Sequence, residues 1–165
     1  MSEGLNKFEF EHSKPIEFAG GTLHRATKRN FPALRGLAIQ ALHLKTGVIR
    51  EMHVHPNANQ LDYCVSGRAR VGIIGPEGHK QLFELTVGDI SFVPQGYLHW
   101  IENLGPEPLH FLVVLSNEEP ETIELSEMLA GIPRDILKKT FGFPQELVDH
   151  VPERAIVIGG GAPVL

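Results

Sequence analysis

The chain has 165 residues, a formal net charge of −5 and a hydrophobic content of 42%. This length predicts one domain with a real core, no apolar run approaches a membrane span, and the absence of a Lys/Arg run argues against nucleic-acid binding. The N-terminal residues lack the basic and apolar regions of a secretory signal, and the one cysteine, Cys64, excludes an internal disulfide framework, so we expect a cytoplasmic protein.

Residues from about 15 to 116 are expected to form a mainly β structure. Short β-rich runs alternate with turns rich in Gly, Pro and Asn, and these runs cover 36–44, 61–65, 69–74, 90–93 and 109–115. Residues 75–78, Gly-Pro-Glu-Gly, predict a hairpin turn. Many short strands with close turns are typical of a sandwich or barrel rather than of alternating strands and helices.

The sequence after Asn117 predicts a helical extension over about 121–152. Three short helices are expected, at about 124–129, 133–142 and 144–151; Pro133 and Pro144 begin the second and third, and Gly142 closes the second after two lysines. The glycines at 159–161 predict a flexible tail over about 158–165. We expect the whole chain, 1–165, to be a single domain.

His53-Val-His55 is the most informative motif of the chain. Residues two apart on a strand point to the same face, so an extended His-x-His aims two imidazoles at one point. Imidazole binds Mn, Fe, Co, Ni, Cu or Zn. His99 follows the Pro94-Gln-Gly96 turn and could supply a third imidazole, so we predict metal binding by these three histidines. The other six have no such spacing and are interpreted as ordinary residues: His12, His24, His43, His79, His110 and His150.

Two spaced patterns resemble the two cupin motifs. In the first, Gly47 precedes His53-x-His55, and Gln60 and Gly67 follow; in the second, Gly88 precedes Pro94-x-Gly96, His99 and Asn103. The resemblance implies a double-stranded β-helix, a jelly-roll barrel with a metal inside its mouth. The stretch from Arg50 to Gln60, Arg-Glu-Met-His-Val-His-Pro-Asn-Ala-Asn-Gln, is similar to one half of a bicupin oxalate decarboxylase, and the chain also resembles germins.

The resemblance implies roles for individual residues. Metal ligands would be His53, His55, His99 and Gln60, the last at a position where the family has Glu. Arg50 corresponds to the arginine that anchors the substrate, with a surface or interface charge at a strand entry as the alternative. Glu119 corresponds to the acid of a catalytic lid, with Glu118 and Glu121 as alternatives. A solvated surface turn without a catalytic role is the other interpretation of this acidic loop.

Gln60 departs from the resembled family. A neutral amide oxygen leaves the full +2 charge of a divalent ion in place, which favours Lewis-acid chemistry on an anionic substrate and weakens the case for oxidised manganese. A small cupin that isomerises unsaturated uronates has a similar set of three His and one Gln. In the alternative, Gln60 swings away and leaves a three-histidine site, as in several dioxygenases.

Asp62 shares strand parity with Gln60 and is therefore expected to face the barrel interior. A buried carboxylate is costly unless it is paired or hydrogen-bonded. It could accept a hydrogen bond from the Gln60 amide or from a ligand histidine, or act as a general base. A bulge that turns Asp62 outward is the alternative.

Together these features predict a metal-dependent lyase, decarboxylase or isomerase that acts on a small anionic metabolite. One divalent transition metal per chain is expected, manganese first, with Fe, Ni, Co or Zn as alternatives. A dioxygenase and a non-catalytic metabolite-binding module remain open. We also expect a homodimer, or a larger germin-like assembly, because a lone barrel would leave apolar residues of the extension poorly covered: Ile136, Leu137, Leu147 and Val148.

Overall fold

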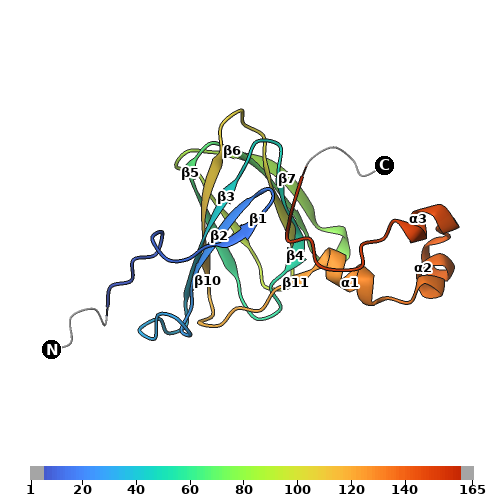
Figure 1. Ribbon diagram of the computed structural model, residues 1–165, viewed down its shortest axis with the longest axis horizontal. Coiled ribbons are helices and arrows are strands. Elements are labelled where there is room, and N and C mark those ends of the chain that lie inside the picture. Colours follow the sequence, from blue (N-terminus) through green and yellow to red (C-terminus); the bar gives the residue numbers. More distant parts are fainter. Residues whose placement is uncertain (1–5, 161–165) are drawn as a thin grey trace.

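The protein folds as two antiparallel sheets that face each other around an apolar core (Figure 1). The structure is a computed structural model and describes residues 6–160. The first sheet has the order β1 (Ile16–Phe18), β2 (Gly21–Ala26), β3 (Ala38–Leu44), β10 (Leu109–Leu115), β5 (Gln60–Ser66) and β8 (Ile90–Val93). The second has the order β11 (Ile123–Glu124), β4 (Ile49–Val54), β9 (Leu98–Asn103), β6 (Arg68–Ile74) and β7 (Lys80–Thr86), and β12 (Ile158–Gly159) also pairs with β4.

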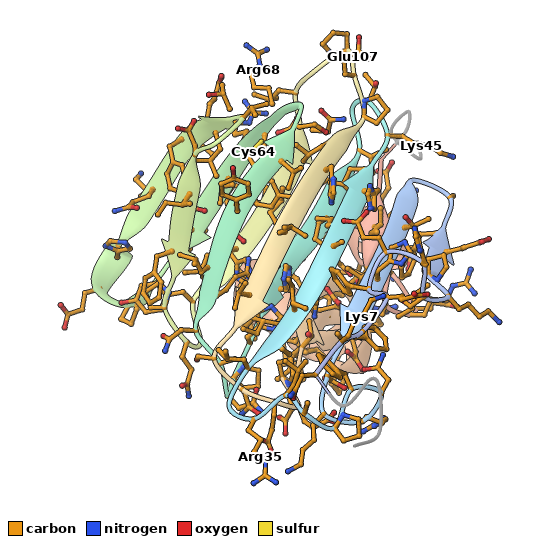
Figure 2. The ribbon with its side chains drawn as sticks, turned by 90° about the vertical axis from the view of Figure 1, so that its left-hand side faces the viewer. Lys7, Arg35, Lys45, Cys64, Arg68 and Glu107 are labelled. Carbon is orange, nitrogen blue, oxygen red and sulfur yellow. The ribbon has the colours of Figure 1, made fainter. Side chains whose placement is uncertain are left out.

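This architecture confirms the mainly β expectation. Each predicted strand run matches an observed strand, and the predicted turn is the short helical turn η1 (Pro76–Gly78) between β6 and β7. Alternation along the strands builds the core: in β10, every second residue from Leu109 to Leu115 is buried, while its neighbours are half-exposed. The outer face of the first sheet is turned toward the viewer in Figure 2.

The C-terminal helices α1 (Leu125–Gly131), α2 (Arg134–Phe141) and α3 (Gln145–Asp149) confirm the predicted helical texture. Helix α1 packs against β4, whereas α2 and α3 stand away from the barrel as a pair (Figure 1). This pair buries Leu137 and Val148, but Ile136 and Leu147 are about half exposed. The extension therefore covers only part of its own apolar surface.

The first residues of the predicted flexible tail, 158 and 159, form a strand instead. Ile158 and Gly159 form β12 and pair with Arg50 and Ile49 of β4, and the Ile158 side chain is buried. A buried apolar side chain and a ladder of backbone hydrogen bonds outweigh the local flexibility that the neighbouring glycines suggest. Residues 161–165 of the predicted tail lie outside the described residues.

Within residues 6–160, no helix has the length and apolar character needed to cross a membrane.

Candidate metal centre

Three histidines converge inside the barrel from two neighbouring strands. His53 lies on β4 and pairs with His99 of β9, and His55 comes directly after β4. Gly96 adopts a left-handed backbone (φ 78°) in the turn before β9, and its N–H donates to the His55 carbonyl, which fixes this turn beside the site. The three rings are buried, and one ligand atom of each lies within 4.8 Å of the others.

The backbone fixes which nitrogen of each ring is free. Nδ1 of His53 lies 2.7 Å from the Glu51 carbonyl oxygen, Nδ1 of His55 lies 2.8 Å from that of Glu121, and Nδ1 of His99 lies 3.0 Å from that of Tyr97. A carbonyl oxygen only accepts, so Nδ1 carries the proton and Nε2 keeps its lone pair. Such hydrogen bonds orient metal-bound histidines in many sites.

Burial keeps these imidazoles neutral. It lowers the pKa of His99 to about 3 and the pKa of His53 well below its ordinary value. The pKa of His55 is also lowered, chiefly by burial. The neutral imidazole is the form that binds a metal, so the cluster is ready for a cation at neutral pH.

Gln60 completes the cluster, and Asp62 orients it. The Gln60 amide nitrogen donates to Oδ1 of Asp62 at 2.7 Å, and Ser91 donates its hydroxyl to Oδ2 at 2.6 Å. Gln60 Oε1 therefore points inward, 3.1 Å from Nε2 of His99. With the His99 proton on Nδ1 and the Gln60 amide nitrogen bound to Asp62, both Nε2 and Oε1 are acceptors. Two acceptors so close repel each other unless a cation attracts both.

Asp62 is fully buried and faces the interior, as strand parity predicts. Burial raises its pKa to about 6, against the lowering effect of the hydrogen bonds from Ser91 and Gln60. At neutral pH the carboxylate is mostly ionised and holds the Gln60 amide in one orientation. Both carboxylate oxygens are occupied, so the geometry suits a positioning role better than that of a general base.

Arg50 reaches the cavity because β4 contains a bulge. Between Arg50 and His53 the register with β9 shifts, so that Arg50 and Glu51 are both buried although they are neighbours. The Arg50 guanidinium donates two hydrogen bonds to Glu124, at 2.6 and 2.7 Å, and one to the Val157 carbonyl at 2.8 Å. Its charge is therefore largely balanced within the protein, which sequence reasoning did not foresee.

His53, His55 and Gln60 line a narrow cavity with room for about one water-sized molecule. Its polar lining is Gln40, Arg50, His53, His55 and Gln60, and its apolar walls are Leu23, Leu42, Ile101 and Val113. The site is thus built to hold a small polar group against apolar walls.

Glu119 lies outside this cavity, in an adjoining hollow that Gln40 shares. The hollow is lined by Arg25, Thr27, Arg29, Asn30, Gln40, Glu119 and Pro120. Glu119 contacts the Thr27 hydroxyl at 3.3 Å, whereas Glu118 pairs with Lys28. Glu121 contributes its backbone carbonyl to His55. Among the three acids, Glu119 is therefore the one at the mouth of the cavity, and it does not contact the histidines.

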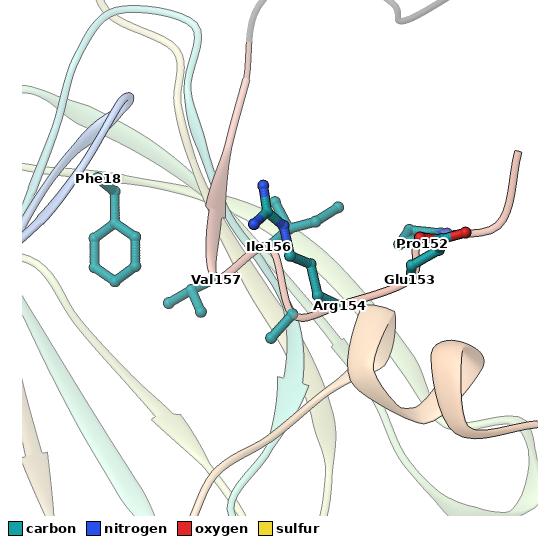
Figure 3. A pocket seen from close by; sticks show the side chains of 7 residues that line it. Phe18, Pro152, Glu153, Arg154, Ile156 and Val157 are labelled. Atoms are coloured by element: carbon teal, nitrogen blue, oxygen red, sulfur yellow. The ribbon is translucent and has the colours of Figure 1, made fainter.

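A wider hollow lies elsewhere, between Phe18 and the C-terminal segment (Figure 3). It is lined by Phe18, Pro152, Glu153, Arg154, Ala155, Ile156 and Val157. None of the histidine ligands reaches it, so we place the functional site in the narrow cavity instead.

The sequence matches the cupin family model over residues 9–149, and the chain belongs to this family. Among its relatives is an oxalate decarboxylase of Bacillus subtilis, 31% identical over 136 residues, which cover 82% of this chain and 35% of that protein. A germin-like protein of Arabidopsis thaliana is 26% identical and is covered over 64% of its length. The chain thus spans about a third of the length of the decarboxylase.

The solved structures agree with this assignment. A structure from a study of the Mn(II) centres of Bacillus subtilis oxalate decarboxylase superposes with a TM-score of 0.88 at 27% identity. The match covers 93% of this chain and 41% of the other. The jelly-roll expectation is therefore confirmed, and the buried histidine cluster fits a divalent metal ion.

Several groups of the site were missed from the sequence. The carbonyls behind the histidines carry no side-chain signal, and Ser91 and Glu124 belong to strands whose pairing the sequence did not reveal. Arg25 stands on β2 with the parity of Leu23, which lines the cavity, so a strand prediction for residues 21–26 would have placed it near the mouth.

Proposed function

We propose that this chain is a metal-dependent enzyme that acts on a small carboxylate by Lewis-acid chemistry. The observation that carries the proposal is the short distance between Gln60 Oε1 and His99 Nε2, 3.1 Å, where both atoms are acceptors because the His99 proton lies on Nδ1. Three imidazoles and one amide are neutral ligands. A bound divalent ion would keep its +2 charge and polarise a carboxylate oxygen strongly.

The protein residues would position and enclose the substrate. A guanidinium has five N–H donors, and Arg50 uses three of them on Glu124 and Val157, so two remain for a carboxylate. Gln40 would face the substrate from β3 of the opposite sheet, and the apolar walls would exclude water. Glu119 at the mouth would exchange protons only if its loop moved inward.

Arg25 is a second candidate anchor for the carboxylate. It lines the mouth of the cavity, and its Nε lacks a hydrogen-bond partner among residues 6–160. Burial is the main cause that lowers its pKa, followed by the charge of Arg50. Two arginines near a small cavity favour an anionic substrate over a neutral one.

The relatives support a small carboxylate and a divalent metal, with manganese as the first choice. One ion per chain is expected from the single barrel. Because Gln60 replaces an anionic ligand, we propose lyase, decarboxylase or isomerase chemistry on a hydroxy or keto acid ahead of oxalate decarboxylation by oxidised manganese. The cavity has room for about one water-sized molecule, so the entry of even a small acid would require its lining side chains to move apart.

The proposal can be tested by turnover. Metal-stripped protein is reloaded with manganese, and small hydroxy, keto and dicarboxylic acids, including oxalate, are followed by proton NMR and by carbon dioxide release, with and without oxygen. We expect metal-dependent and oxygen-independent conversion of at least one acid, which His53→Ala/His99→Ala abolishes. Oxygen-dependent turnover would favour the dioxygenase alternative. Tight carboxylate binding without any turnover would favour a binding module.

We also propose a homodimer. The helical pair stands away from the barrel and leaves Ile136, Phe141 and Leu147 exposed, which a second chain could cover. A monomer that persists at all concentrations in sedimentation would contradict this. The cytoplasmic location expected from the sequence stays a prediction.

A further inference from the structure

A second group of metal-binding side chains lies on the outer face of the first sheet. His43 of β3 and His110 of β10 are directly paired across the strands, and their rings stack with centroids 4.3 Å apart. Glu11, from the segment before β1, lies over them: its carboxylate oxygens are 3.1 Å from His110 Nε2 and 3.8 Å from His43 Nε2. One ligand atom of each residue lies within 4.8 Å of the others.

One of these ligand atoms has no satisfactory partner. His110 Nε2 is shielded from solvent and makes no hydrogen bond with any residue in the range 6–160, although Glu11 is close. Hydrogen bonds weaken steeply when donor and acceptor are misaligned, so closeness alone does not satisfy this nitrogen. A buried polar atom without a partner is costly. A cation placed between the two imidazoles and the carboxylate would contact all three at once.

The N-terminal segment is held where it can supply Glu11. Phe8 stacks on Phe31 with ring centroids 5.4 Å apart, and Phe10 meets the edge of His24 at 6.4 Å. The Ser13 hydroxyl donates to the Phe10 carbonyl at 2.5 Å. In Figure 2 this segment, marked by Lys7, lies on the side of the sheet that faces the viewer. Phe8 and Phe10 thus hold the segment against the rest of the protein just before Glu11, and the Ser13 hydrogen bond fixes the local turn around it.

The charges around the cluster suit a divalent cation. The groups that face His43 are Glu11, His110 and His24. Burial lowers the pKa of His43, the neighbouring His110 lowers it further, and Glu11 opposes both effects. Two imidazoles favour an ion of the zinc type over magnesium or calcium, and the carboxylate neutralises half of its charge.

We propose that Glu11, His43 and His110 form a second metal site, outside the barrel, that binds a zinc-like divalent ion. Two imidazoles and one carboxylate are a common zinc ligand set, and a fourth position stays open to solvent. The ion would fasten the N-terminal segment to the sheet. The rival account is a simple ion pair between Glu11 and a protonated histidine, which needs no metal.

The experiment separates this site from the inner one by starting from the variant His53→Ala/His99→Ala. Metal-stripped protein is titrated with cobalt(II), which reports nitrogen and oxygen ligands through its visible absorption, and zinc content is measured after equilibrium dialysis. We expect one zinc or cobalt ion per chain in this variant. Adding Glu11→Gln or His110→Asn should weaken binding by more than about tenfold, because even changes behind a ligand cost about 10- to 100-fold.

Matched controls use neighbours with the same chemistry. Glu9→Gln removes an exposed acid two positions from Glu11, and His79→Asn removes a histidine remote from the cluster; neither should alter the titration. The proposal fails if the starting variant binds no zinc or cobalt, or if Glu11→Gln and His110→Asn leave binding unchanged. Folding is checked in chains with the inner site intact: there Glu11→Gln and His110→Asn should still take up manganese.

Discussion

The barrel interior and the outer face of the first sheet carry similar groups in different surroundings. Inside, His53, His55 and His99 are buried, and each Nδ1 faces a backbone carbonyl. Outside, His43 and His110 are partly exposed and face a single carboxylate. The inner ligands are all neutral and rigidly oriented, whereas the outer set includes an anionic group from a chain end. The comparison indicates that the surroundings, more than the residue types, decide what a histidine cluster does.

The largest expected effect is the loss of the inner metal. His53→Ala/His99→Ala removes two of three imidazoles, so bound manganese should fall from close to one ion per chain to nearly none. Metal analysis after gel filtration measures this. The outer variant His43→Asn/His110→Asn should keep its manganese. Manganese retained by the inner variant would contradict the site assignment.

A second comparison concerns two arginine–glutamate pairs of the second sheet, one buried and one exposed to solvent. Arg50 and Glu124 are only 5% and 7% exposed, whereas Arg70 and Glu102 are 41% and 20% exposed. Arg50→Ala leaves a buried charge unpaired and should lower the free energy of unfolding by about 3–5 kcal/mol. Arg70→Ala should cost less than about 1 kcal/mol. Chemical denaturation measures the free energy of unfolding of both variants and of the wild type.

Removing both members of the inner pair separates stability from substrate binding. Arg50→Met/Glu124→Leu should recover most of the stability, since apolar residues can replace a buried pair. If Arg50 anchors the carboxylate, this folded variant should still lose anion affinity. If Arg50→Met/Glu124→Leu keeps its anion affinity and Arg25→Ala loses it, the carboxylate is anchored by Arg25 instead of Arg50.

Acidification should destabilise the metal-free protein through the inner cluster. The unfolded histidines take up protons near pH 6.5, but the folded ones do not until lower pH, about 3 for His99, so stability falls as the pH drops through this window. Asp62 opposes this, because its raised pKa of about 6 makes the folded chain hold a proton that the unfolded chain releases. Three histidines outweigh one aspartate, so we expect a loss of about 2–4 kcal/mol between pH of about 7.5 and about 5.

Urea unfolding of chelator-treated protein at the two pH values checks this slope. His99→Asn should reduce it, because one of the buried titrating groups is gone, whereas His79→Asn on the surface should leave it unchanged. A slope that is the same in wild type and His99→Asn would show that the buried histidines do not control acid stability.

The smallest expected effect concerns the charge of the metal ligands. Gln60→Glu lowers the site charge by one unit, so carboxylate affinity should fall by about tenfold while metal retention holds or improves. The new carboxylate would also face Asp62, which now accepts a hydrogen bond from the Gln60 amide at 2.7 Å. Gln60→Glu/Asp62→Asn replaces that repulsion with a donor and should retain metal better than Gln60→Glu alone. Isothermal titration measures both quantities, and equal values for all variants would exclude Gln60 as a ligand.

Local patterns predicted much of this molecule. Strand periodicity and turn residues identified β3, β5, β6, β8 and β10, and the His-x-His spacing predicted the convergence of His53 and His55 that the structure shows. The parity of Gln60 and Asp62 also placed both inside. These features depend on residues close together in the chain, where the geometry of a strand is enough.

The remaining features depend on pairing between distant segments. The bulge in β4 turns Arg50 inward, and β11 brings Glu124 to it from 74 residues away. The outer cluster exists because β3 and β10 pair in a register that places His43 opposite His110. No single segment reveals that register, so these histidines were interpreted as ordinary residues.

Anomalous diffraction from crystals of manganese-loaded protein tests the central claim most directly. The account predicts a peak bonded to Nε2 of His53, His55 and His99 and to Oε1 of Gln60, with Asp62 still accepting the Gln60 amide hydrogen bond. No peak at these atoms would contradict the metal site itself. A peak held by the three histidines alone, with Gln60 turned away, would contradict the neutral four-ligand site and favour the three-histidine dioxygenase.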